Sequence, residues 1–111
     1  MDSTRQNKIS KLIQKELAEI FLHDGPAIYD CMITVTKTTI TRDLSIARAY
    51  LSIFNAEDTD QTIKNIRTNS KEIRYRIGQK LKNQLRIIPQ LEFFVDDSLD
   101  YIENIENLLK Q

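Results

Sequence analysis

Two runs of alternating apolar and polar residues, separated by a short turn, interrupt a chain that otherwise follows helical spacing. The first run, residues 31–40, is rich in β-branched side chains, and the second, residues 47–54, alternates small or aliphatic residues with larger or polar ones. A period of two is typical of strands with one buried face. Residues 41–45 between them have the composition of a turn. We therefore predict a β-hairpin, which excludes an all-helical fold.

Before the hairpin, apolar residues at helical spacing predict an amphipathic helix of about five turns. These residues are Ile9, Leu12, Ile13, Leu17, Ile20 and Phe21. A polar residue among Asp2, Ser3 and Thr4 is expected to cap the start of this helix. The sequence Asp24-Gly25-Pro26 is expected to end it.

After the hairpin, the pattern predicts two helices joined by a kink. Asp58 or Thr59 is expected to cap the first of them. Poor helix formers cluster around Asn69-Ser70, so the kink is expected there. The second helix is expected to cover residues 71–88, because apolar residues continue at helical spacing until Pro89 ends it.

The remaining residues predict a third strand over 91–95 and a C-terminal helix begun by Asp97 or Ser98. The element order is then α-β-β-α-α-β-α, an α+β fold with a three-stranded sheet. A length of 111 residues suits a single domain over residues 1–111 with one hydrophobic core.

The composition and the hydropathy of the sequence argue against several classes of protein. The one cysteine, Cys31, excludes an internal disulfide and a multi-cysteine zinc site. The N-terminus lacks the apolar core of a signal peptide, and no apolar run approaches the ~20 residues of a membrane span. Nothing in the sequence indicates an obligate oligomer. We therefore expect a small cytoplasmic monomer without a membrane partner.

The charges are unevenly distributed along the chain. Sixteen Lys and Arg balance sixteen Asp and Glu, so net charge alone indicates no anionic partner. Residues 64–86, however, contain eight basic residues and one acidic residue, whereas residues 87–106 contain six acidic residues and no basic one. Segments of opposite sign predict one positive and one negative face. In the alternative interpretation, the two segments pair in the fold and neutralise each other.

The positive segment places its cations on one flank of the helix predicted over residues 71–88. A helical wheel puts the apolar residues within about a third of the circle, where they face the core. The flank beside them carries Lys71, Tyr75, Gly78, Lys82 and Arg86. Arg74 lies at the edge of the apolar stripe, and Arg76 and Lys80 lie on the far side.

This flank has the side chains that an RNA-binding surface needs. Cations attract phosphates, a tyrosine ring stacks on a base, and a glycine permits close approach of the backbone. The alternative is an ordinary solvated helix face, with Gly78 packed against a neighbouring strand.

Residues that could carry catalysis lack partners. His23 has no second base or metal set nearby and is expected to interact with the last carbonyls of its helix. Cys31 is expected to act as a small apolar residue. The cluster of Asp96, Asp97, Ser98 and Asp100 is expected to provide helix caps and not a metal site. No phosphate loop or nucleophile elbow is present. We therefore expect no enzyme, no cofactor and no metal.

Three segments resemble those of a known family. They are Arg5-x-x-Lys8-Ile9 with Glu16-Leu17, the hairpin sequence from Thr41-Arg42-Asp43-Leu44-Ser45 to Ser52, and the sequence from Leu85-Arg86-Ile87-Ile88-Pro89 to Leu99. Together they resemble the bacterial ribosome-binding factor A family over nearly the whole chain. The family has the element order of a type II KH fold, α-β-β-α-α-β, which the predicted elements match. KH modules are usually associated with RNA.

The resemblance implies a non-catalytic assembly factor. Proteins of this family bind the free 30S small ribosomal subunit late in its maturation and assist processing of the 5′ end of 16S rRNA. They matter most in the cold and act alongside assembly GTPases that promote their release. The chain departs from the RNA-gripping KH pattern, because it has no G-x-x-G loop. It also has Asn69-Ser70-Lys71 where the family has Ala-x-Gly at the kink.

The leading hypothesis is therefore binding of small-subunit rRNA by the positive face. The expected RNA-binding residues are Lys71, Arg74, Tyr75, Lys82 and Arg86, with Asn69 and Ser70 shaping the kink and with Lys8, Lys11, Lys80 and Arg76 extending the surface. Two alternatives remain open. One is a general KH-like RNA-binding module that has no connection with ribosome assembly. The other is a protein-interaction module that meets a basic partner through Glu92, Asp96, Asp97, Asp100, Glu103 and Glu106.

Overall fold

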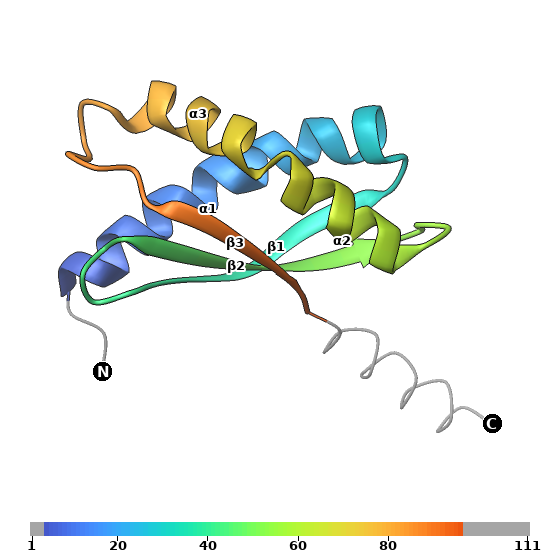
Figure 1. Cartoon of the computed structure of the whole chain (residues 1–111), viewed down its shortest axis with the longest axis horizontal. Coiled ribbons are helices and arrows are strands. Elements are labelled where there is room, and N and C mark those ends of the chain that lie inside the picture. The colour runs from blue at the N-terminus through green and yellow to red at the C-terminus, as the bar shows by residue number, and fades with distance from the viewer. Residues whose placement is uncertain (1–3, 97–111) are drawn as a thin grey trace.

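The computed structural model describes residues 4–96, and Figure 1 shows three helices lying along one side of a three-stranded sheet. In chain order the elements are α1 (Thr4–Asp24), the π-helical turn η1 (Gly25–Tyr29), β1 (Met32–Ile40), β2 (Ile46–Phe54), α2 (Thr59–Thr68), α3 (Ser70–Leu81) and β3 (Gln90–Val95). This order confirms the expected α+β fold with its three-stranded sheet and kinked helix pair. The predicted C-terminal helix lies outside the described residues.

The sheet has the order β1-β2-β3, with β2 in the centre. Strands β1 and β2 pair in antiparallel fashion and confirm the predicted hairpin, with a bulge between Val35 and Lys37. Strand β3 runs parallel to β2, from Gln90 opposite Ile46 to Val95 opposite Leu51. A parallel pair needs a long crossover, which here contains α2 and α3. The start of β3 therefore lies beside the turn between β1 and β2.

The core lies between the sheet and the helices. Alternate residues of β2, among them Ala47, Ala49 and Leu51, are fully buried, as a period of two requires. Phe21 of α1 meets Phe93 of β3 edge to face, with ring centroids 5.9 Å apart. This contact packs the helix that begins the chain against the strand that ends the sheet.

The junction between α2 and α3 is held by the side chain predicted to mark it. The backbone N–H of Asn69 donates to the carbonyls of Asn65 (3.2 Å) and Ile66 (3.0 Å), and its Nδ2 donates to the hydroxyl of Tyr29 (2.9 Å). At the other end of α2, Asp58 Oδ1 accepts from the N–H of Gln61 (3.1 Å). The predicted kink and the predicted cap are both confirmed.

Helix α1 ends at Asp24, where the sequence Asp24-Gly25-Pro26 predicted its end. The chain then continues through the π-helical turn of residues 25–29 before β1 begins. Pro26 fits there because a proline in the first turn of a helix gives up no internal hydrogen bond. Gly25 is buried, and a Cβ at this position would lie 2.8 Å from the carbonyl oxygen of Cys31. Glycine therefore allows the chain to turn tightly into the sheet.

Helix α3 is shorter than predicted, since it ends at Leu81 and residues 82–89 form a loop. The prediction over 71–88 was wrong because Leu85 and Ile88 pack against the core from within the loop, and their spacing imitates that of a helix. Extending α3 through 88 would carry the chain about 10 Å along the helix axis. Instead the chain turns back, so that Gln90 N–H reaches the carbonyl of Ser45 (2.9 Å) and starts β3.

Candidate nucleic-acid interface

Most of the predicted RNA-binding residues line one hollow, which we call the basic groove. It lies between the outer face of α3 and the segment that leads from the loop into β3, and it encloses about 860 Å³. Its lining consists of Ser70, Lys71, Arg74, Tyr75, Gly78, Gln79, Lys82, Arg86, Ile87, Ile88, Gln90 and Leu91. Six of the eleven residues that the sequence predicted are therefore brought together, although Arg86 is not on a helix.

The loop forms the second wall of the basic groove because Arg74 holds it against α3. Arg74 donates from Nε and Nη2 to the carbonyl of Ile88 (3.2 and 2.6 Å) and from Nε to the carbonyl of Pro89 (3.1 Å). These bonds turn part of the guanidinium toward the protein backbone. Arg74, predicted to contact RNA, therefore has a structural contact in this fold as well.

Three other cations of the basic groove point to solvent without an acidic partner. Lys71, Lys82 and Arg86 are exposed, and within residues 4–96 none of them forms an ion pair. Unpaired cations retain their full attraction for a phosphate chain. The arrangement can therefore hold an anionic backbone without first breaking internal contacts.

Flat and apolar side chains lie between these cations. Tyr75 is 67% exposed and Ile87 is 69% exposed. An exposed ring beside cations provides a surface on which a base stacks. Gly78, in contrast, does not adjoin a strand: a Cβ there would lie 3.5 Å from Cγ1 of Ile88 in the loop.

The remaining predicted residues do not join the basic groove. Asn69 is part of the kink and donates to Tyr29, as described above. Lys80 lines a separate small hollow together with Arg76 and with Glu16 and Glu19 of α1. The structure therefore separates Lys80 from the cations of the basic groove.

Arg76 is held by a buried carboxylate. Its Nη1 donates to Oδ2 of Asp24 (2.6 Å), and the Asp24 side chain is only 6% exposed. Burial acts to raise the pKa of Asp24, but the hydrogen bonds from His23 and Arg76 and the charge of Arg76 outweigh it and lower that pKa. The expectation that Arg76 extends the RNA surface is not supported, since its guanidinium links α3 to the end of α1.

Lys8 and Lys11, one helical turn apart on α1, lie in different surroundings. Lys8 lines a second hollow, here called the α1 pocket, whereas Lys11 lines neither this pocket nor the basic groove. Arg5 and Arg42 also line the α1 pocket. In the sequence, Arg5 and Arg42 are notable only as members of the family motifs, because no local sequence pattern indicates that they lie together in the fold.

The other candidates for chemistry have structural contacts. Nδ1 of His23 lies 3.0 Å from Oδ1 of Asp24, so His23 meets a carboxylate and not the helix carbonyls expected. Burial, with a smaller contribution from Asp30, raises the pKa of the Cys31 thiol and disfavours the reactive thiolate. Within residues 4–96 no group of three potential ligands could hold a metal ion, and no helix has the length and apolar character to cross a bilayer.

Of the six acidic residues predicted to form the negative face, only Glu92 and Asp96 belong to the part of the chain that the structure describes. Glu92 pairs with Arg48 of β2 (3.0 Å) and not with a cation from residues 64–86. The carboxylate of Asp96 accepts from the hydroxyl of Thr36. The other four residues of this face lie outside the described part of the chain. The two charged segments therefore do not neutralise each other through Glu92.

Comparison with known proteins yields matches along almost the whole sequence. The family model described as "Ribosome-binding factor A" matches residues 5–109. A curated protein of that name from Flavobacterium johnsoniae is 42% identical over 111 residues, which cover 98% of this chain and 85% of the relative. One from Cytophaga hutchinsonii is 38% identical over 112 residues, which cover 100% of this chain and 84% of the relative.

Solved structures share the fold. The crystal structure of ribosome-binding factor A from Thermus thermophilus matches with a TM-score of 0.68 at 16% identity, over 81% of this chain and 94% of that one. A homology model of the T. thermophilus protein, fitted into a cryo-EM map of its 30S complex, matches with a TM-score of 0.59 at 14% identity, over 87% of this chain and 97% of that one.

Proposed function

Because the chain belongs to the ribosome-binding factor A family, we propose that it binds the free small ribosomal subunit through rRNA. Support for this partner comes from the family and from the relative whose model was fitted into a 30S complex. The residues proposed to contact RNA directly are Lys71, Tyr75, Lys82 and Arg86 of the basic groove. Arg74 and Asn69 contribute by holding the loop and the kink, respectively.

One observation carries this proposal: three cations converge on one groove around an exposed tyrosine, and none of the three forms an ion pair within residues 4–96. A solvated helix face needs no such convergence from two separate segments. A phosphate backbone, in contrast, gains from every cation it meets along its path.

The finer role follows from the family. We propose that the protein assists late maturation of the subunit and processing of the 5′ end of 16S rRNA without catalysing a reaction itself. We also propose that it acts as a cytoplasmic monomer, that assembly GTPases promote its release, and that it matters most in the cold. Growth of a deletion strain at low temperature, with mapping of 16S rRNA 5′ ends, tests this role.

The first test of the partner is sedimentation of the tagged protein through a sucrose gradient of cell lysate at several salt concentrations. We expect the protein in the fractions of free small subunits, and not with large subunits or assembled ribosomes. Protein that stays at the top of the gradient even at low salt would contradict the proposal. Equal competition by unrelated bulk RNA would favour a general RNA-binding module instead.

The second test reverses the charge of three residues in the basic groove. Replacing Lys71, Lys82 and Arg86 by Glu should abolish cosedimentation while the circular dichroism spectrum remains that of the folded protein. The matched control replaces Lys11, Lys15 and Lys64 by Glu, because these lysines are exposed but lie outside the basic groove. Both variants have the same net charge, so only the site of the change differs. Retained binding by a folded groove variant would contradict the assignment of these three residues as RNA contacts.

A further inference from the structure

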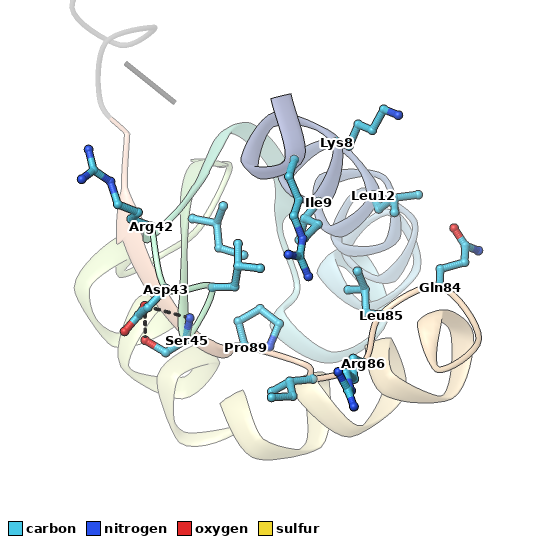
Figure 2. A pocket seen from close by; sticks show the side chains of 14 residues that line it. Lys8, Ile9, Leu12, Arg42, Asp43, Ser45, Gln84, Leu85, Arg86 and Pro89 are labelled. Atoms are coloured by element: carbon cyan, nitrogen blue, oxygen red, sulfur yellow. Dashed lines mark hydrogen bonds between the residues drawn. The ribbon is translucent and has the colours of Figure 1, made fainter. Parts of the chain in front are cut away.

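The α1 pocket has an apolar floor built from three segments that are distant in the sequence. Figure 2 shows Ile9, Leu85 and Pro89 around its interior. The hollow has a volume of about 630 Å³ and is also lined by Leu12, Ile40 and Leu44. This size and lining fall within the range of sites for small organic groups. No aromatic side chain belongs to its lining.

The rim of the α1 pocket is cationic. Arg5 and Lys8 come from α1, Arg42 from the turn between β1 and β2, and Arg86 from the loop after α3. All four are exposed, and none forms an ion pair among the described residues. In Figure 2, Lys8 and Arg42 extend outward on opposite sides of the opening. An anionic group at the mouth of the pocket would therefore meet positive charge from several directions.

One carboxylate, that of Asp43, also reaches the rim. Its Oδ1 accepts hydrogen bonds from the hydroxyls of Ser45 (2.7 Å) and Thr41 (2.8 Å) and from the Ser45 N–H (3.1 Å). These bonds, that from the Ser45 hydroxyl foremost, lower the pKa of Asp43 and keep it ionised. An ionised carboxylate at a fixed position accepts hydrogen bonds from the amino groups on the edge of a base.

The α1 pocket adjoins the basic groove. Arg86 and Ile87 line both hollows, because the loop that carries them lies between the two. A strand of RNA that extends from the basic groove past Arg86 therefore comes close to the α1 pocket. An acidic peptide would also match the cationic rim, but a nucleotide matches the cations with its phosphates and also offers a flat base to the apolar floor.

We propose that the α1 pocket captures one unpaired nucleotide of the bound RNA, with its base on the apolar floor and its flanking phosphates near Lys8, Arg42 and Arg86. This proposal rests on the proposed function and adds a preference to it. The groove binds RNA backbone of any sequence, whereas the pocket selects RNA in which a base is free to leave the helix.

The experiment compares two RNA hairpins that differ by one bulged 2-aminopurine nucleotide. Wild-type protein should bind the bulged hairpin about tenfold more tightly than the fully paired one, because a bulged base enters the pocket without the cost of breaking a base pair. The 2-aminopurine fluorescence should rise on binding, because the base leaves its stacked neighbours for a pocket without aromatic side chains. Both affinities are measured in the same buffer, since phosphate contacts depend strongly on salt.

Two pairs of variants locate the effect. Leu12→Trp fills the pocket and should abolish the preference for the bulge while affinity for the paired hairpin stays unchanged. Leu22→Trp is its control, because Leu22 is 79% exposed on the same helix and lines neither hollow. Lys8→Glu should weaken binding of the bulged hairpin several-fold more than Lys11→Glu does.

The outcomes separate this proposal from the proposed function. Equal wild-type affinity for the two hairpins overturns nucleotide capture, even if small subunits still bind. A preference that survives in Leu12→Trp overturns the location. If Leu12→Trp leaves the preference intact and instead abolishes binding of an acidic peptide of residues 97–111, the pocket is a peptide site. Failure of wild-type protein to bind small subunits overturns the proposed function itself.

Discussion

Arg74 donates two hydrogen bonds to the carbonyl oxygen of Ile88, at 3.2 Å from Nε and 2.6 Å from Nη2, and this contact ties the loop after α3 to the helix itself. The loop carries Arg86 and Ile87, which line both the basic groove and the α1 pocket. A single side chain of α3 thus positions residues of both hollows.

Replacement of Arg74 by Ala should lower the free energy of unfolding by about 1–3 kcal/mol, because it leaves the carbonyls of Ile88 and Pro89 without a charged donor. Urea denaturation measures this change. Lys71→Ala is the control, because Lys71 is exposed and should change stability by less than about 0.5 kcal/mol. Equal urea midpoints for the two variants would show that Arg74 does not hold the loop.

Single substitutions in the basic groove should change how RNA binding depends on salt. Lys71→Ala, Lys82→Ala and Arg86→Ala should each reduce the slope of log K against log salt by about 0.7–0.9, because each removes one phosphate contact. Fluorescence anisotropy with a labelled rRNA fragment at several salt concentrations gives the slope. Lys11→Ala should leave it unchanged. A wild-type slope in all three groove variants would mean that these cations do not touch phosphates.

The pairing of Arg76 with Asp24 should make stability depend on pH at the acidic end. The pKa of Asp24 is lowered in the folded protein from its ordinary value of 3.8. Stabilisation by its ionised form is therefore complete above that value and declines as pH falls through the lower folded value. Asp24→Asn should be less stable than wild type at pH 7, and the difference should shrink below about pH 4.

Thermal melts between pH 2.5 and 7 test this pH dependence. Glu57→Gln removes an exposed carboxylate from the loop before α2 and is the control, because it should show a small difference at every pH. A difference between Asp24→Asn and wild type that stays constant down to pH 2.5 would contradict the role of the ionised Asp24 carboxylate.

The two glycines should respond in opposite directions to replacement by alanine. Gly78→Ala should stabilise the protein by about 0.5–1 kcal/mol, because alanine favours a helix and the new Cβ would meet Ile88 Cγ1 at an ordinary 3.5 Å. Gly25→Ala should destabilise it, because its Cβ would lie 2.8 Å from the carbonyl oxygen of Cys31. Urea denaturation compares them. RNA affinity that falls sharply in Gly78→Ala would instead support close approach of RNA to the helix backbone.

Features of the fold that depend on neighbouring residues could be predicted from the sequence. The strands follow from alternation, the start of α2 from the Asp58 side chain, and the kink from Asn69. The end of α3 could not be predicted in this way. Leu85 keeps helical spacing and is buried, yet it packs against the core from a loop, and spacing alone does not distinguish the two cases.

In the candidate site, too, residues of one helix could be grouped from the sequence, whereas contacts with other segments could not. The helical wheel grouped Lys71, Tyr75 and Lys82 correctly, since they lie on or next to α3. It grouped Arg86 with them for the wrong reason, because the loop and not the helix places Arg86 there. Lys80 was expected to extend the RNA surface, but its neighbours Glu16 and Glu19 belong to another helix.

The sequence by itself determined which face of each element is buried and where the charges gather along the chain, because periodicity and composition act over a few residues. Only the tertiary structure decided that Arg5, Arg42 and Arg86 surround one pocket. Parallel pairing of β3 with β2 places the loop after α3 beside the hairpin turn, and α1 packs against the same sheet. Pairing between segments separated by tens of residues brings these cations together, and no local sequence pattern predicts that pairing.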